Sequence, residues 1–248
     1  MFIVISILYS EWFSKEKNIM KIFITGASKG IGLFLLRKFI IDGYAVCGTY
    51  SSTLPLEEFE ANFTKVNIGS TEEVNDWIKK SADENSEIVL INCAGTNYNA
   101  IARKADVDRW KELIDINLIG IFRTINAVLP LMYEKGFGRI INFSSILAQK
   151  GVAGTSAYAA SKSALWGMTK TIAVENAKHN ITVNNINLGY FEIGMTLSDV
   201  PELLQIEMKK QIPSNKFGNP EEIYKTVRYL IESDYITGTS IDLNGGLY

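Results

Sequence analysis

The sequence has little of what marks a metal site, a disulfide-rich domain or a nucleic-acid binder. Its 248 residues include one histidine and two cysteines, and 25 basic side chains nearly balance 27 acidic ones. Cys47 and Cys93 stand apart without the spacing of a zinc or disulfide motif, and we expect buried thiols in a reducing compartment such as the cytoplasm. We therefore predict no metal site, and the charge balance does not favour a nucleic-acid partner.

A long hydrophobic run is absent from the N-terminus. Residues 2–8 are apolar, but they are far fewer than the roughly 20 that a membrane-spanning helix needs. No basic segment precedes them and no small-residue cleavage site follows, so we predict neither a membrane span nor a secretory signal. Met20 stands directly before the first expected strand. We interpret residues 1–19 as an extension outside the fold, with Met20 as a candidate true start; an appended helix or a weak surface anchor is the alternative.

Short apolar runs alternate with helical stretches along the rest of the chain, in which 47% of all residues are hydrophobic. This alternation predicts an α/β fold: a single Rossmann-type doubly wound domain over residues 20–248, with an about seven-stranded parallel sheet and helices on both faces. The expected strands are residues 21–25, 44–50, 63–67, 87–92, 139–145, 182–187 and 239–243. The expected helices are residues 30–42, 71–84, 106–134, 157–179, 201–211 and 220–233.

Two helix starts and one long connection stand out. Thr71 and Asp106 have the side chains and positions of N-cap residues. Residues 188–217 form the least regular stretch, with two prolines and several large apolar side chains. Long connections in compact domains often serve as lids, so we interpret this stretch as a flap over the substrate.

The first expected strand runs into the glycine-rich turn Thr25-Gly26-Ala27-Ser28-Lys29-Gly30-Ile31-Gly32, which is followed by an apolar helix. Glycine is needed where a turn is tight and where backbone approaches a pyrophosphate, and the helix N-terminus supplies free N–H groups. A glycine-rich turn alone could be only a tight loop. Its position between a strand and a helix, at the start of a βαβ pattern, predicts a dinucleotide site.

The second strand favours NADP(H) over NAD(H) as the cofactor. NAD sites usually have an acid at the end of this strand, which binds the ribose hydroxyls. Here Tyr50 is followed by Ser51 and further hydroxyl residues, and no acid occurs before Glu57. Lys29, within the glycine-rich turn, could meet a 2′-phosphate, although a solvated loop lysine is the alternative.

Tyr158 and Lys162 lie four residues apart at the head of an expected helix, and therefore on one face. An ammonium group near a phenol favours the phenolate, so we expect Lys162 to lower the pKa of Tyr158. Ser145 closes the fifth expected strand, where its hydroxyl could polarise a substrate carbonyl. Ser144 is the competing choice, but neighbouring strand residues point to opposite faces. A serine nucleophile is poorly supported, because His179 lies at the far end of the next helix.

These motifs resemble the classical short-chain dehydrogenase/reductase family over residues 21–248. The matching elements are the glycine-rich turn, Asn92-Cys93-Ala94-Gly95 after the fourth strand, Asn117 in the long helix, and Ser145, Tyr158 and Lys162. The resemblance implies a catalytic tetrad of Asn117, Ser145, Tyr158 and Lys162, with Tyr158 as proton donor and Asn117 holding a water in a proton relay. It implies cofactor contacts at Gly26, Ser28, Lys29, Gly30, Ile31, Gly32, Ser51, Asn67, Asn92, Ala94, Gly95, Tyr158, Lys162, Gly189 and Ile193.

Within the family the chain most resembles 3-oxoacyl-acyl-carrier-protein reductases, in Gly138-Arg139-Ile140-Ile141-Asn142 and in its C-terminal residues 235–248. Two departures stand against that subgroup. Leu188 and Ile193 replace a proline and a threonine after the sixth strand. Basic residues expected on a carrier-docking face are missing at Gly136-Phe137 and His179-Asn180, which leaves less positive charge for an acidic carrier protein.

The expected reaction is therefore reversible hydride transfer between NADP(H) and a carbonyl, with a 3-oxoacyl thioester as one substrate class. A keto-sugar, polyol or secondary metabolite is the alternative within the family, and an NADP(H)-binding sensor or scaffold is the alternative without catalysis. The residues expected to line the substrate pocket are Tyr98, Leu147, Gln149, Tyr190, Phe191 and Glu192, although ordinary flap packing would equally explain Tyr190 and Phe191. The two long helices are apolar on more than one face, which together with the family resemblance predicts a homotetramer, with a dimer as the alternative.

Overall fold

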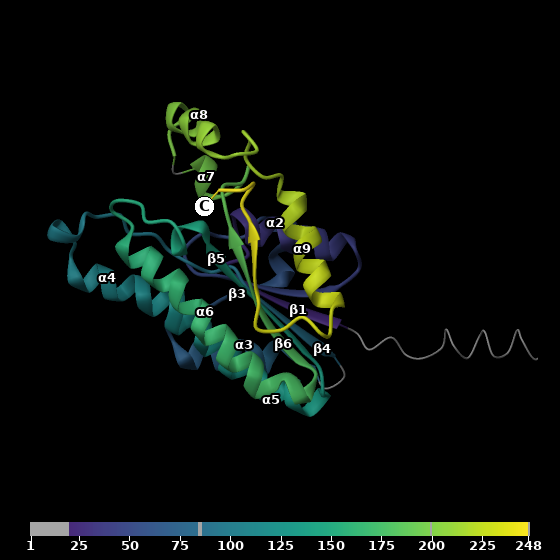
Figure 1. The fold of residues 1–248 in the computed structure, drawn as a ribbon. Coiled ribbons are helices and arrows are strands. Elements are labelled where there is room, and N and C mark those ends of the chain that lie inside the picture. The colour runs from purple at the N-terminus through teal and green to yellow at the C-terminus, as the bar shows by residue number, and fades with distance from the viewer. Residues whose placement is uncertain (1–19, 84–85, 199, 248) are drawn as a thin grey trace, which may run out of the picture.

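The computed structural model describes residues 20–83, 86–198 and 200–247, and its strands form one parallel sheet with helices on both faces (Figure 1). The strand order is β3-β2-β1-β4-β5-β6-β7, so the winding direction switches between β1 and β4. In open sheets of this kind ligands bind beyond the carboxyl ends of the strands at such a switch. The predicted doubly wound α/β fold is confirmed. The interpretation of residues 1–19 lies outside the described residues.

Each of the seven predicted strands is present, with ends within two residues of the predicted ones. β5 and β6 are buried along their whole length, as expected for strands that helices cover on both sides. The strands are β1 (Met20–Thr25), β2 (Ala45–Tyr50), β3 (Phe63–Lys65), β4 (Glu87–Asn92), β5 (Gly138–Ser145), β6 (Ile181–Leu188) and β7 (Ser240–Leu243).

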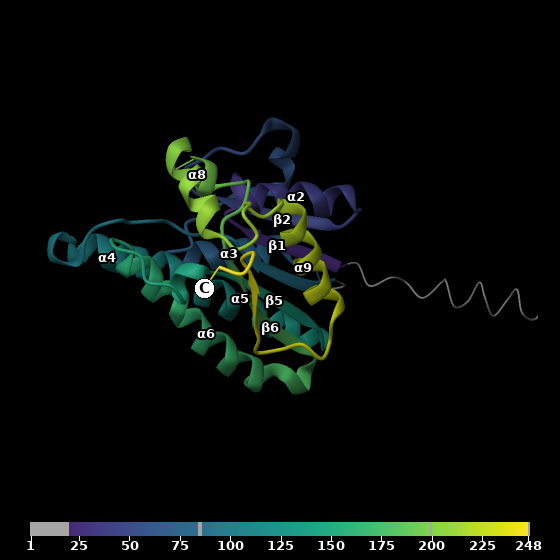
Figure 2. The same cartoon turned by 45° about the horizontal axis from the view of Figure 1, so that its top comes forward.

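Two sets of helices cover the two faces of the sheet (Figure 2). On one face lie α2 (Gly30–Ile41) and α9 (Pro220–Glu232). On the other lie α3 (Thr71–Ser81), α5 (Ile121–Lys135) and α6 (Ser156–Asn176), and α4 (Val107–Ile114) packs against α6. The remaining helical segments are α7 (Met195–Ser198), α8 (Glu202–Gln211) and the short turns η1 (Glu57–Asn62), η2 (Ala102–Lys104), η4 (Ile146–Ala148) and η5 (Ala177–His179).

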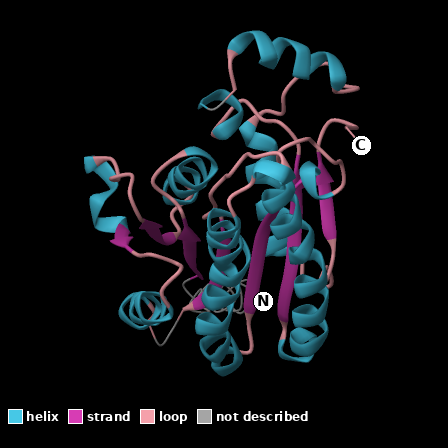
Figure 3. Cartoon of the chain, turned by 90° about the vertical axis from the view of Figure 1, so that its left-hand side faces the viewer, coloured by secondary structure: helices cyan, strands magenta, loops and turns pink. Residues whose placement is uncertain are grey.

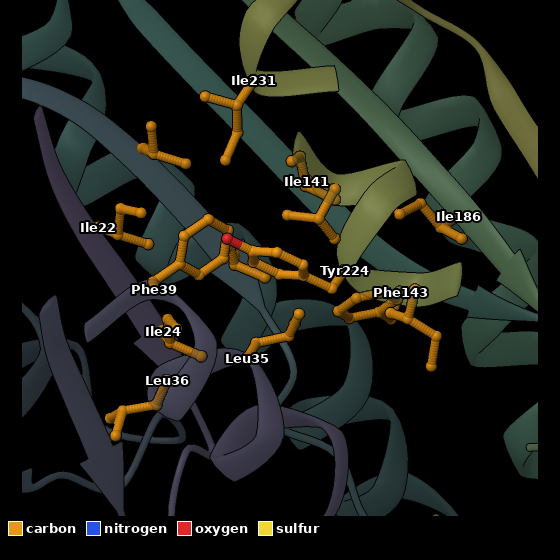
Figure 4. Packing of buried hydrophobic residues seen from close by; sticks show 14 of the residues in the cluster. Ile22, Ile24, Leu35, Leu36, Phe39, Ile141, Phe143, Ile186, Tyr224 and Ile231 are labelled. Atoms are coloured by element: carbon orange, nitrogen blue, oxygen red, sulfur yellow. The ribbon is translucent and has the colours of Figure 1, made fainter. Parts of the chain in front are cut away.

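The core under α2 and α9 is apolar and aromatic. Figure 4 shows Phe39 of α2 and Tyr224 of α9 meeting above Ile22 and Ile141 of the sheet. The two rings are 5.0 Å apart between centroids and meet edge to face, a favourable arrangement for aromatic pairs. This packing fixes α2 on the sheet, and with it the glycine-rich turn at the start of α2.

The helix predicted over residues 106–134 is not one regular α-helix. α4 ends at Ile114, and the π-helical turn η3 (Asp115–Gly120) separates it from α5. Gly120 lies so close to the loop between β3 and α3 that a Cβ there would be 2.9 Å from the Ile68 side chain. The prediction missed the turn because the residues on both sides keep helical apolar spacing.

The segment Val107–Lys135 is also long and apolar enough to cross a bilayer by composition. In the fold its inner side packs on the sheet, where Ile125 and Val128 are completely buried. A core helix of an α/β domain has the same composition, so the segment is weak evidence for a membrane span.

Of the two predicted helix caps, Asp106 is confirmed and Thr71 is wrong. Asp106 Oδ1 accepts hydrogen bonds from the backbone N–H groups of Asp108 (2.9 Å) and Arg109 (3.0 Å). At α3 the cap is Ser70, whose hydroxyl accepts from the Glu73 N–H at 3.3 Å. Ser70 and Thr71 are both cap-type residues, and the chain leaves the extended conformation one residue earlier than predicted.

Of the predicted flap, residues 189–198 and 200–217 rise beyond the carboxyl ends of the strands, with α7 and α8 above the sheet (Figure 3). The segment is fastened at its base by two backbone bonds, from Glu192 N–H to the Gly218 carbonyl (3.0 Å) and from Gly218 N–H to the Tyr190 carbonyl (2.9 Å). α8 was predicted, whereas the short α7 was not. Its position beyond the strand ends is consistent with the predicted flap, and its role as a cover over a ligand stays a prediction.

Candidate active site

The glycine-rich turn is held by contacts of its own backbone with the strands beside it. Gly26 N–H donates to the Thr49 hydroxyl (3.1 Å), and Ala27 N–H donates to the Thr49 carbonyl (2.8 Å). Gly26 has φ +63°, and a Cβ there would lie 2.7 Å from Ala94 Cα. A Cβ on Gly32 would lie 2.4 Å from the Gly26 carbonyl oxygen. Both positions therefore require glycine, and the turn forms a backbone cradle at the N-terminus of α2 that fits a pyrophosphate.

The predicted 2′-phosphate contacts, Lys29 and Ser51, are both exposed near this cradle. Lys29 is the extended residue before α2, and its side chain makes no capping bond. Of the glutamates in η1, Glu58 forms an ion pair with Arg37 of α2 at 2.9 Å. The Glu58 carboxylate therefore joins η1 to α2. The preference for NADP(H) that the hydroxyl residues at the end of β2 indicate stays a prediction.

The side chain of Asn92, at the end of β4, is turned into the protein. It donates to Asn142 Oδ1 (2.9 Å) and accepts from the Thr124 hydroxyl (2.8 Å). Only the main chain of Asn92 is then left for a cofactor contact. The next residues are held by the Thr25 hydroxyl, which accepts from Ala94 N–H at 3.1 Å.

Asn67, predicted to lie near the adenine, is exposed after β3. Its side-chain oxygen accepts from the Gly69 N–H at 2.9 Å, and its own N–H donates to the Glu73 carboxylate at 2.8 Å. These bonds stabilise the turn into α3. A contact of Asn67 with a cofactor stays a prediction.

Tyr158, Lys162 and Ser145 meet where α6 begins and β5 ends. Lys162 Nζ donates to the Phe143 carbonyl (2.8 Å) and lies 5.6 Å from the centre of the Tyr158 ring. The side chains of Ser145 and Tyr158 are hydrogen-bonded to each other. The structure thus assembles a phenol, a hydroxyl and an amine at the carboxyl edge of the sheet, the groups that polarise a carbonyl and move a proton.

The expectation that the pKa of Tyr158 is lowered is wrong in direction. Burial raises the pKa of Tyr158 above its usual value, and the hydrogen bond with Ser145 only partly offsets this. Burial also lowers the pKa of Lys162 to about 8, against a smaller opposing effect of Cys93. Desolvation is the largest cause of both shifts, and spacing along a helix could not reveal it. A phenol that stays protonated at neutral pH is a proton donor, which suits carbonyl reduction.

Asn117 lies in the π-helical turn η3 and is completely buried. Its side chain pairs with the backbone of Thr96, accepting from the N–H (2.8 Å) and donating to the carbonyl (2.9 Å). A Cβ on Gly95 would be 3.4 Å from Asn117 Oδ1 and 3.9 Å from Lys162 Nζ, so the loop after β4 joins the two residues. Asn117 positions this loop, and its relay water stays a prediction.

Two of the residues expected to line a substrate pocket point elsewhere. Gln149 Nε2 donates to Asp242 Oδ1 on β7 (2.9 Å), on the α6 side of the sheet. The Phe191 ring is buried in the core beside Gly218, where a Cβ would come within 2.4 Å of it. These contacts turn the Gln149 side chain toward β7 and the Phe191 ring into the core, and a contact of either side chain with a substrate stays a prediction.

The other pocket candidates make different contacts. Leu147 and Tyr190 belong to one apolar cluster with Phe217, and burial raises the pKa of the Tyr190 phenol. Tyr98 Oη accepts from the Asp106 N–H (2.8 Å), and the Arg109 guanidinium lies 4.4 Å from the centre of its ring. Glu192 is exposed. Their contacts with a substrate stay predictions.

The first departure from the family pattern, at Leu188 and Ile193, lies at the start of the flap. Gly189 N–H donates to the Leu243 carbonyl (2.9 Å), and a Cβ on Gly189 would lie 2.7 Å from Asn244 Cα. Ile193 packs its side chain on the core, and Gly194 follows it against the phosphate turn at Gly30. The flap therefore begins in direct contact with the cradle.

Three threonines that hold this site were not predicted. Thr25 and Thr49 bond the backbone of the loops after β4 and β1, and the backbone of Thr96 receives Asn117. All three stand at or just beyond strand ends, where hydroxyl and amide groups meet loop backbone. Their position at strand ends is the sequence feature from which they could have been predicted.

Comparisons with known proteins agree with this arrangement. The model of a family described as short chain dehydrogenase matches residues 20–202. The 3-oxoacyl-[acyl-carrier-protein] reductase FabG of Staphylococcus epidermidis is 34% identical over 238 residues, which cover 91% of this chain and 97% of the relative. The acetoacetyl-CoA reductase of Rhizobium meliloti is 35% identical over 233 residues, with coverages of 91% and 97%. A solved structure of a variant actinorhodin polyketide ketoreductase with NADPH superposes with a TM-score of 0.83 at 26% identity, covering 92% of this chain and 97% of the other.

Proposed function

Because the chain belongs to the short-chain dehydrogenase family, we propose that it is an NADPH-dependent oxidoreductase that reduces the keto group of a 3-oxoacyl thioester to a hydroxyl. One observation carries the proposal: a protonated phenol, Tyr158, hydrogen-bonded to Ser145 and close to Lys162, lies at the same edge of the sheet as the glycine cradle. Relatives named as thioester reductases cover nearly the whole chain and support the substrate class.

The cradle residues Gly26 and Gly32 fit the pyrophosphate of NADPH, because any side chain there would collide with neighbouring backbone. Lys29 and Ser51 would hold the 2′-phosphate, and Lys162 would hold the nicotinamide ribose. The bound NADPH supplies a hydride to the carbonyl carbon. In this proposal the cofactor would extend from the cradle to the Tyr158 phenol.

The protein's part in the reaction is to bind the carbonyl oxygen and give it a proton. The Ser145 hydroxyl hydrogen-bonds the carbonyl oxygen and stabilises the charge that develops on it. Tyr158 then donates its phenolic proton to that oxygen, which forms the hydroxyl, and the phenolate regains a proton from solvent. Each turnover consumes one NADPH and one proton and yields NADP⁺ and the alcohol.

The substrate class can be tested directly against its main alternative. We expect purified protein to oxidise NADPH faster with acetoacetyl-CoA than with a panel of keto-sugars and small ketones. Acetoacetyl-CoA needs no carrier-docking face, so weak docking at Gly136–Phe137 and His179–Asn180 does not affect it. A clear preference for a keto-sugar would overturn the thioester proposal while preserving carbonyl reduction, and the reduced charge of that face favours this second candidate.

The alternative to an enzyme is a sensor or scaffold that binds NADP(H) and catalyses no reaction. Tight NADPH binding, measured by nucleotide fluorescence, together with no NADPH oxidation on any carbonyl would support the sensor and overturn the enzyme. The assembled phenol, hydroxyl and amine favour the enzyme.

We also propose that the chain forms a homotetramer, or a dimer, through α4, α5 and α6. These helices carry exposed apolar side chains, among them Phe122 on α5 and Val174 on α6, which is 83% exposed. A surface of this kind usually meets another surface. Light scattering that gives the mass of a single chain would contradict this proposal.

Finally, we propose that the protein works in the cytoplasm, where NADPH and acyl thioesters are at hand. Fractionation of cells that express the tagged chain should place it in the cytosolic fraction. Recovery with membranes would contradict this location.

A further inference from the structure

A chain of side-chain hydrogen bonds joins α6 to the end of β5 on the side of the sheet away from Ser145. The Ser144 hydroxyl donates to the main-chain carbonyl of Lys162 (2.9 Å). The indole Nε1–H of Trp166, one helical turn further along α6, lies 3.1 Å from the Ser144 hydroxyl and 3.0 Å from Asn187 Oδ1. Trp166 therefore joins the helix to two strands at once.

The chain of bonds continues across the sheet to β7. Asn187 Nδ2 donates to Asp242 Oδ1 (2.6 Å), and Gln149 Nε2 donates to the same oxygen (2.9 Å). Ser144, Asn187 and Asp242 stand side by side in register on β5, β6 and β7, which puts their side chains on one face. We call the residues Ser144, Trp166, Asn187, Asp242 and Gln149 the strand-end network.

The network reaches the reactive lysine through two neighbouring residues of β5. The Phe143 carbonyl accepts from Lys162 Nζ, and the Ser144 hydroxyl donates to the Lys162 carbonyl. The next residue, Ser145, bonds the Tyr158 phenol. Three consecutive residues of one strand thus hold the lysine at both ends and the tyrosine at its hydroxyl.

Burial makes each hydrogen bond of the network hard to replace. Ser144 is 3% and Asn187 1% exposed, so a missing partner could not be replaced by bulk water. Apolar side chains could fill the same space without fixing the angle or register of α6. Directional bonds do fix it, and reacting groups are sensitive to displacements of about 1 Å.

We propose that Trp166, Asn187 and Asp242 are positioning residues that, through Ser144, hold the Lys162 turn of α6 against the end of β5. The inference rests on the proposed carbonyl reduction for its kinetic consequence. Its structural consequence, a fixed environment of the Lys162 amine, can be measured without turnover.

The variants Ser144→Ala and Trp166→Phe each break the network while keeping most of the packing. A cavity of about 290 Å³ borders Trp166, Asn187 and Asp242, so the smaller ring of phenylalanine can settle without strain. Ser163→Ala is the matched control, because the Ser163 hydroxyl also bonds a main-chain carbonyl near the end of β5, that of Ala148 (3.1 Å), but is outside the network. Asp242→Asn keeps an oxygen that accepts both amide donors, whereas Asp242→Leu removes it.

The kinetic test uses acetoacetyl-CoA and NADPH deuterated at the transferred position. We expect Ser144→Ala and Trp166→Phe to lower kcat about tenfold, with the KM for NADPH changed less than about twofold and a larger deuterium isotope effect than the wild type. The double variant should lose no more than the worse single one, since both break one chain of bonds. Asp242→Asn should behave like the wild type and Asp242→Leu should show a smaller loss of kcat with the same change in isotope effect. An unchanged isotope effect in all variants, or an equal loss in Ser163→Ala, overturns the proposal.

The second readout is the titration of the Lys162 ¹³Cε signal in labelled protein, assigned by its loss in Lys162→Met. We expect its midpoint to rise from about 8 in the wild type by about half a unit or more in Ser144→Ala and Trp166→Phe, because a loosened amine gains water. Ser163→Ala should leave it in place. If the wild type reduces no carbonyl but the midpoint still moves, the proposed function fails and the positioning role stands. If the enzyme is active and neither midpoint nor isotope effect moves, the positioning role fails alone.

Discussion

The end of β5 and the flap lie next to each other above the sheet, yet they are built by different interactions. At the end of β5, buried polar groups meet in specific pairs: Lys162 binds the Phe143 carbonyl at 2.8 Å, and Ser145 binds Tyr158. On the flap helix α8, apolar side chains face outward, with Leu203 80% and Leu204 56% exposed. Directional bonds hold the reacting groups at fixed distances, whereas an exposed apolar surface can adapt to different chains. We therefore expect changes in the first, rigid region to act on the chemistry and changes in the second, adaptable region to act on the choice of substrate.

The largest loss of kcat is expected when the proton donor is removed from the rigid region at the end of β5. Tyr158→Phe should lower kcat by about a thousandfold, because general acid catalysis contributes about 10²–10⁴-fold. The rate is measured from NADPH absorbance with acetoacetyl-CoA. Tyr235→Phe, at a phenol that is 97% exposed, is the matched control and should have no effect. A Tyr158→Phe enzyme with a normal fold, NADPH affinity and kcat would remove Tyr158 from the mechanism.

The affinity of the glycine-rich cradle for NADPH should depend strongly on the charge of one residue, Lys29. Lys29→Glu should raise the KM for NADPH by about 10–100-fold, the value of a charge-assisted bond to phosphate, and leave the KM for NADH nearly unchanged. Lys178→Glu, an exposed lysine on η5 at the other end of the sheet, controls for the change in net charge. An equal effect on both nucleotides would show that Lys29 does not meet the 2′-phosphate.

The rigid region should also respond to pH through Lys162. Its pKa of about 8 and the raised pKa of Tyr158 mean that the amine loses its proton first as pH rises. We expect kcat/KM for reduction to fall about tenfold per pH unit above about 8. Between about 8 and 10.5 the unfolded lysine still holds its proton, so folding stability should rise over the same window. A rate that stays level to pH 10 would contradict the role of the ammonium.

The smallest effect is expected on the adaptable side. Leu204→Ser should change the KM for longer acyl thioesters by about threefold and leave kcat and the KM for acetoacetyl-CoA unaltered. Ile41→Ser, at an isoleucine that is 77% exposed on α2, is the matched control and should change neither constant. A loss of kcat in Leu204→Ser would mean that α8 belongs to the rigid region after all.

The sequence predicted the fold well because alternating strands and helices are a local property. Each buried strand is a short apolar run between turn residues, and each such run became part of the sheet. The reactive groups were also accessible, because Tyr158 and Lys162 share a helix and Ser145 ends a strand. Their proximity follows from the topology alone.

What the sequence could not show depends on which way side chains turn and what surrounds them. Gln149 reaches β7, Phe191 turns into the core, and burial reverses the expected pKa shift of Tyr158. These outcomes are set by contacts between residues far apart in the chain. The strand-end network is hidden for the same reason, since Ser144, Asn187 and Asp242 meet only through strand register.

The π-helical turn η3 has a mechanical meaning for the rest of the molecule. A wider turn winds less per residue, so α5 leaves it rotated about its own axis relative to a regular continuation of α4. This phase shift directs Ile125 and Val128 into the sheet and Phe122 outward. Deleting one residue from η3 would restore regular α-helical winding. The buried and the outward faces of α5 would then rotate together about the helix axis. A single local irregularity thus sets which side chains of α5 face the core and which face outward.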